Sequence, residues 1–224
     1  MPRPRLHDLD QALDVAERLV AEGGPGALTV RALSAATGVP NGAIYHGFGS
    51  LAALRGRLWL RAAVDFLDLQ AQLITQALDA GSPPDSAVNA VIAAADAPAA
   101  FADQRPAAAR MLMTVDRNQL LGPELPDQLA DSLLDLDRRL VSEVLCRLAV
   151  ALWGRRDDET VEVMTTCVVD LPTALLRRAF HQPGPDGSVR ISADRRARLA
   201  AAVRAVLHDA PPTRQPPRPA GSCT

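Results

Sequence analysis

A chain of 224 residues, 48% of them apolar, is long enough to bury a substantial core, but only 3% of its residues are aromatic. That core must be built from Ala, Leu and Val. Because Ala and Leu are strong helix formers, the composition favours an all-α fold and excludes a β-rich one. The formal net charge of −2 gives no general basic character, so any contact with nucleic acid requires an uneven distribution of charge.

The N-terminal residues predict an arm followed by a first helix. Two arginines between prolines within the first seven residues favour either an extended arm that can touch DNA or a disordered terminus. Asp8 or Asp10 can start the helix, and Gly23-Gly24 should end it. This helix is expected to brace the segment that follows.

Two short helices joined by a tight turn are predicted between residues 29 and 48. Thr29 is suited to cap the first, and Gly38 follows it, where a residue without Cβ adopts the left-handed conformation at no steric cost. Pro40 stands near the start of the second helix, whose inner face carries Ile44 and Phe48. Two helices of about two turns each around a glycine are typical of a helix-turn-helix.

The stretch TVRALSAATGVPNGAIYHGFGS resembles the N-terminal signature of the tetracycline-repressor (TetR) family of regulators. The motif covers roughly residues 8 to 62; beyond it only size and an all-helical layout agree. The resemblance implies a three-helix DNA-binding domain followed by a larger helical domain for ligand binding and dimerisation. Gly47 stands where His is usual and Leu51 where Lys is usual, and the missing Lys removes a phosphate contact.

In a helix-turn-helix the second helix enters the major groove, while the first crosses the DNA backbone. Asn41 is the most direct base reader available, because its amide can pair with adenine. By the resemblance, Tyr45 and His46 are expected at phosphates; their alternative role is to cap the small core. The predicted DNA-binding residues are Thr29, Arg31, Pro40, Asn41, Gly42, Ala43, Tyr45, His46 and Ser50.

Charge is distributed unevenly. Residues 1 to 61 hold seven Arg against five acids, and residues 62 to 224 hold seventeen Arg against twenty-one acids. No acid occurs between Glu22 and Asp65. This window should form a face that meets phosphates, the alternative being an ordinary solvated face. Its arginines are Arg31, Arg55, Arg57 and Arg61.

A long helix and a larger helical domain are predicted after Ser50, which can cap the helix. About 30 residues span about 45 Å, enough to link two domains, although Gly56 in the interior should cost about 1 kcal/mol relative to Ala. Further helices are predicted at about 84–102, 105–117, 124–154, 157–181 and 193–209. The domains are placed at 1–52 (DNA-binding), 53–210 (ligand-binding and dimerisation) and 211–224 (a disordered Pro-rich tail).

An effector cavity is predicted within the larger domain, where bulky side chains are scarce. Its predicted lining is Phe66, Phe101, Met111, Trp153 and Asp170, with ordinary core packing as the alternative for each. Few charges predict an apolar effector, or a weakly cationic one if Asp170 faces inward. A ligand should act by displacing the long helix, the only covalent link to the DNA-binding motif.

A homodimer interface is predicted on the last two long helices. One apolar stripe comprises Val161, Met164, Val168, Leu171 and Leu175, and the other Leu199, Val203 and Val206. We interpret these stripes as faces that the rest of the domain leaves uncovered. The family resemblance implies the same pair of helices.

Enzymatic, metal and membrane roles find no support in the sequence. The four histidines are scattered and no nucleophile elbow or phosphate loop is present, so no catalytic residue, metal ligand or cofactor is predicted. Three isolated cysteines indicate reduced thiols, and without an apolar leader or a long apolar run a cytoplasmic protein is expected.

These features together predict a ligand-responsive, homodimeric DNA-binding regulator. We expect a repressor that a small molecule releases from a palindromic operator in double-stranded DNA. The alternative hypothesis is a helical interaction protein of the same fold with weakened or lost DNA binding, which Gly47 and Leu51 motivate.

Overall fold

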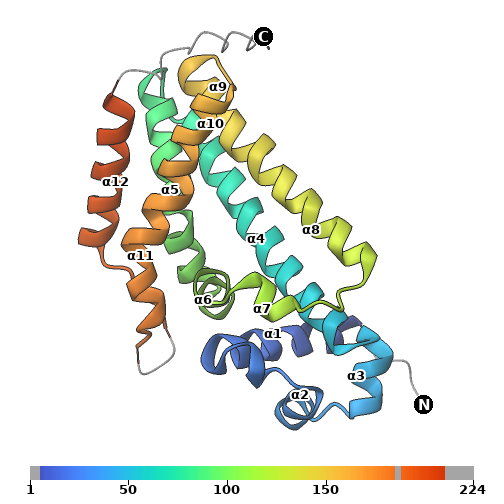
Figure 1. Cartoon of the computed structure of the whole chain (residues 1–224). Coiled ribbons are helices and arrows are strands. Elements are labelled where there is room, and N and C mark those ends of the chain that lie inside the picture. The colour runs from blue at the N-terminus through green and yellow to red at the C-terminus, as the bar shows by residue number, and fades with distance from the viewer. Residues whose placement is uncertain (1–5, 185–187, 210–224) are drawn as a thin grey trace, which may run out of the picture.

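The computed structural model describes residues 6–184 and 188–209, and every regular element within them is a helix (Figure 1). This confirms the predicted all-α class. Most of the predicted N-terminal arm and all of the predicted tail lie outside the described residues. None of the described helices is both long and apolar enough to cross a membrane.

The N-terminal unit consists of α1 (Leu6–Gly23), a 3₁₀ turn (Pro25–Ala27), α2 (Val30–Thr37) and α3 (Asn41–Phe48). Helix α1 begins before both predicted starting residues and ends at the predicted glycine pair. In Figure 1 these helices, in blue, form one end of the molecule, from which the long helix α4 rises. The predicted pair of short helices is confirmed.

Local capping fixes the ends of the short helices as the sequence predicts. The hydroxyl of Thr29 accepts a hydrogen bond from the backbone N–H of Ala32 at 3.0 Å. Gly38 adopts a left-handed φ of 72° and donates its N–H to the carbonyl of Ser34 at 2.8 Å. The backbone polar groups of the turn are thereby satisfied without help from other elements.

Helix α4 (Leu51–Asp79) runs from the N-terminal unit along the length of the larger domain (Figure 1). The Ser50 hydroxyl caps it by accepting from the N–H of Ala53 at 3.0 Å, as predicted. Gln70 is buried in this helix, and its side-chain amide donates to the carbonyl of Ala94 at 2.9 Å. That bond ties α4 to its neighbour α5.

The remaining helices are α5 (Asp85–Gln104), α6 (Pro106–Thr114), α7 (Arg117–Leu121), α8 (Asp127–Arg139), α9 (Arg147–Trp153), α10 (Asp158–Thr165), α11 (Leu171–His181) and α12 (Ala193–His208). Two predicted long helices contain π-helical segments, Leu140–Cys146 and Thr166–Asp170. In the second, Leu171 donates its N–H to Thr166, five residues back. Pro172, which has no N–H to donate, follows directly and accounts for this widened turn.

Helix α12 packs along α5, which corrects our interpretation of the apolar stripes. Leu199 and Val203 are buried within the same chain, as are Met164 and Val168 of the other stripe. Arg196 reinforces the contact by donating to Asp96 and Asp103 of α5. The Ala-rich face of α5 permits this close approach, so these four apolar residues are core, whereas Leu175 of the first stripe stays exposed.

Two of the three cysteines, Cys146 and Cys167, lie within the described residues, and both are free. Burial raises the pKa of the Cys167 thiol to about 11. This thiol therefore stays protonated near neutral pH and is a poor nucleophile.

Candidate nucleic-acid interface

Helix α3 has one buried apolar face and one exposed polar face. Ile44 and Phe48 are buried, together with Val30 and Leu33 of α2. Tyr45 is 52% exposed. Eight of the nine predicted DNA-binding residues are exposed and Ala43 is half-buried, so the set is accessible to a ligand as large as a duplex. Tyr45 and His46, both exposed, do not cap the small core.

Three of the four arginines predicted to form a basic face bond to protein groups, and acids neutralise one of them. Arg61 bonds to Asp14 and Glu17 of α1, so acids remote in sequence oppose it. Arg57 donates to the Gly47 carbonyl at 3.1 Å and lies over the Phe48 ring. Arg55 reaches the carbonyls of Pro25 and Leu28. Arg31 remains exposed, with no ion pair to the described residues.

The two departures from the family pattern have structural counterparts. A Cβ atom at Gly47 would lie 2.4 Å from Cδ2 of Leu9, so the α1 side chain occupies the space that a larger residue would need. Leu51 is half-buried and packs against the core. Both positions serve packing between the helices of the N-terminal unit and the start of α4.

An ionic cluster joins the N-terminal unit to the larger domain, and sequence reasoning missed it. Glu17 of α1 is only 4% exposed. Arg105, between α5 and α6, donates to both of its carboxylate oxygens at 2.8 and 2.9 Å. Arg61 of α4 donates to the same carboxylate, and Asp65 of α4 also accepts from Arg105. The partners lie 44 and 88 residues from Glu17, so no local pattern signals them.

The side chains predicted to line an effector cavity line none of four cavities formed by the described residues. Phe66 and Phe101 make an edge-to-face contact with ring centroids 5.6 Å apart, and Met111 is fully buried. Asp170, the last residue of the second π-helical segment, is exposed, so the condition for a cationic effector is not met. The four cavities have volumes of about 830, 460, 340 and 420 Å³, and Trp153 is likewise absent from their lining.

Comparisons with known proteins agree with this geometry. Residues 12–58 match the model of the family described as bacterial regulatory proteins, tetR family. A TetR-family transcriptional regulator from Streptomyces coelicolor aligns with a TM-score of 0.56 and 21% identity, covering 90% of this chain and 98% of that chain. The TetR-family transcriptional regulator PfmR from Thermus thermophilus aligns with a TM-score of 0.54 and 17% identity, covering 88% and 94%. No curated protein matches. At these identities the structural likeness shows a shared fold.

Proposed function

Residues 12–58 of this chain belong to the tetR family of bacterial regulatory proteins, and from that premise we propose that it represses transcription as a homodimer that a small molecule releases from a palindromic operator. DNA binding is the family's shared property, whereas repression, dimerisation and release are our proposals for this chain. The observation that best supports DNA binding, on which these proposals rest, is the exposed polar face of α3 opposite its packed apolar face. A helix built this way can enter the major groove without losing its own core.

The division of labour between residues 1–52 and 53–210 is also proposed. Helix α4 begins at Leu51, so the boundary falls in its first turn. The buried side chains of α1 to α3 are continuous with the core of the larger domain, and α4 carries the chain from one unit into the other. Any change in the larger domain that moves α4 or the cluster around Glu17 would reposition α3.

A helical interaction protein with weakened DNA binding is the competing function. The observation that favours it is the ion pairing of Arg61 with Asp14 and Glu17, which removes one cation of the predicted basic face from contact with phosphates. Titration of duplex DNA at increasing salt separates the two, because a DNA-binding protein loses affinity as counterions compete. Absence of measurable duplex binding at low salt would support the interaction protein.

Asn41 and Arg31 should have different effects on DNA recognition. Asn41→Ala should cost about 1–3 kcal/mol at one base position and relax the preference there, while Arg31→Ala should weaken all sequences alike. The measurement is selection from random duplex DNA, followed by titration of each variant with the selected site. Arg156→Ala, exposed beyond α9, is the matched control and should change neither quantity. Selected sites without two-fold symmetry would contradict a dimer reading two half-sites.

The proposed dimer should use the outer faces of α11 and α12. Leu175 of α11 is 37% exposed, and α12 exposes Ala197, Ala201 and Ala205 at four-residue spacing. Small side chains let two copies approach closely, so the double variant Leu175→Glu, Ala201→Glu should raise the dimer dissociation constant about a hundredfold or more by burying charge.

Light scattering over a dilution series measures this change. Val150→Glu, on the exposed surface of α9, is the control and should leave the dimer intact. Truncation before α12 is a poorer test than substitution, because it would uncover the buried face of α5 and cause aggregation. A double variant that dimerises as tightly as the parent chain would place the interface elsewhere.

A further inference from the structure

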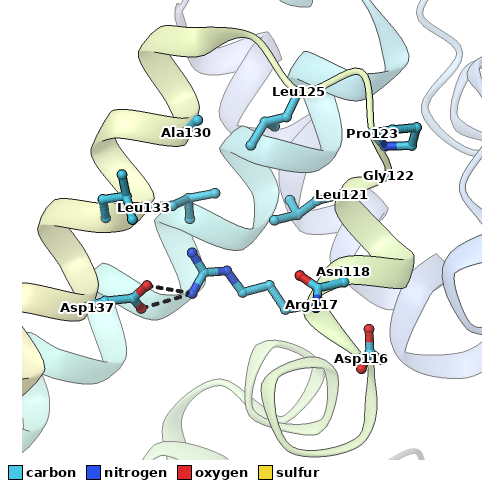
Figure 2. Close-up of a pocket in the computed structure, with 11 residues that line it drawn as sticks. Asp116, Arg117, Asn118, Leu121, Gly122, Pro123, Leu125, Ala130, Leu133 and Asp137 are labelled. Carbon is cyan, nitrogen blue, oxygen red and sulfur yellow. Dashed lines mark hydrogen bonds and ion pairs between the residues drawn. The ribbon is translucent and has the colours of Figure 1, made fainter.

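A cavity of about 830 Å³ opens at the surface between α7, the segment 122–126 and α8 (Figure 2). Its wall is mainly apolar, and its size is in the range of small-molecule sites. The apolar lining includes Leu121, Leu125, Ala130, Leu133 and Leu134. This cavity is separate from the helix-turn-helix and from the side chains that the sequence predicted for an effector.

Arg117 is the single cation in this lining, and part of its guanidinium is free. Figure 2 shows its side chain extended across the cavity to Asp137, and Nη1 donates to both carboxylate oxygens at 2.9 and 3.1 Å. Its Nε and Nη2 atoms make no hydrogen bond to the described residues. Asp116 caps the start of α7, because its carboxylate accepts a hydrogen bond from the backbone N–H of Gln119.

We propose that this cavity binds an organic carboxylate with an apolar body. The free Nε–Nη2 edge of Arg117 presents two parallel N–H donors, which match the two oxygens of a carboxylate. Asp137 satisfies the opposite side of the guanidinium and holds it in place across the cavity. The hydrocarbon part of the ligand then lies on the leucines. A neutral analogue loses the charge-assisted bonds. A cationic analogue can be attracted to Asp116 and Asp137, which also line the cavity, but it cannot accept from the Nε–Nη2 edge of Arg117.

The same cavity borders the contact between α8 and the start of α4. Leu125 lines the cavity and also packs on Gly56, where a Cβ atom would lie 2.7 Å from its Cδ1. Leu129 makes the same kind of contact at 2.9 Å, and it borders a second cavity of about 420 Å³ together with Phe48 and Ser50. Gly56 was expected to lower the stability of the helix, but its missing Cβ is what allows Leu125 and Leu129 to pack closely against α4.

Regulation follows from this shared leucine, and this step rests on the proposed DNA-binding function. A ligand that displaces Leu125 changes the packing on α4 within two turns of the helix-turn-helix. Since Gly56 leaves no free space, the displacement shifts α4 relative to α8 instead of being absorbed. The bound and free states then differ in the position of α3.

Calorimetric titration with octanoate, without DNA, tests the site. Octanoate should bind the parent chain, and Arg117→Gln should weaken binding at least about tenfold, as expected for loss of a charged hydrogen-bonded pair. Arg117→Lys keeps the positive charge but loses the paired N–H donors, so its affinity for octanoate should lie between those of the parent chain and Arg117→Gln. Arg138→Gln, exposed on α8 outside the cavity, is the matched control and should bind like the parent. Octylamine and octanol should bind more weakly than octanoate.

Equal octanoate affinity of the parent chain and Arg117→Gln would overturn the site, as would tighter binding of octylamine. Thermal melting of each variant shows that it is folded. The coupling is tested with the selected duplex: octanoate should weaken binding by the parent chain and have less effect on Leu125→Ala. Octanoate that binds at Arg117 without changing duplex affinity would overturn the coupling. A chain that binds no duplex refutes the proposed function, while the calorimetry still decides the carboxylate site.

Discussion

Replacing Arg61 and Arg105 together by Met should lower the free energy of unfolding by about 3–5 kcal/mol, because it leaves a buried carboxylate without a cation. Glu17 is 4% exposed and takes four hydrogen bonds from these two arginines, so no other described cation satisfies it. Urea denaturation followed by circular dichroism measures the change. The protein concentration must be held fixed, because dimerisation contributes to apparent stability.

The matched control for the cluster is Arg138→Met, which removes an exposed pair with Asp135 on α8. That substitution should change the unfolding free energy by no more than about 1 kcal/mol, because exposed ion pairs contribute little. A double variant that behaved like this control would mean that Glu17 finds water or another donor. The helices α1, α4 and α6 would then be held together by apolar packing alone.

Phe101→Ala should also lower the free energy of unfolding by about 3–5 kcal/mol, because the removed ring leaves a cavity in the core. Phe101 is 2% exposed, and its ring meets that of Phe66 edge to face. The sequence allows two roles for Phe101, cavity lining and core packing, and this measurement separates them. A residue that lines an open site can be truncated at little cost to stability, whereas a packed ring cannot.

Phe101→Leu is the control, since it fills most of the volume and should cost clearly less. Both variants are compared with the parent chain by urea denaturation at one protein concentration. A change within about 0.5 kcal/mol for Phe101→Ala would show that its surroundings tolerate an empty space. That outcome would favour cavity lining, the other role that the sequence allows for Phe101.

The sequence by itself determined the helix-turn-helix and the capped ends of α2 and α4, because these depend on neighbouring residues. The hydroxyls of Thr29 and Ser50 accept hydrogen bonds from N–H groups three residues further along the chain. Gly38 ends α2 because glycine adopts a positive φ without steric cost. The apolar spacing of Ile44 and Phe48 likewise defines one face of a short helix. Local chemistry of this kind was sufficient to predict the DNA-binding motif.

Only the tertiary structure decided which charges and apolar faces remain available. Arg61 stands in an acid-free window, yet Glu17, 44 residues away, lies beside it once α1 packs on α4. The stripe on α12 has the period of any amphipathic helix, and the period does not say whether α5 or a second copy covers it. The cavity beside Arg117 likewise depends on how α7 and α8 meet α4, since Gly56 and Leu125 are distant in sequence and close only in the fold.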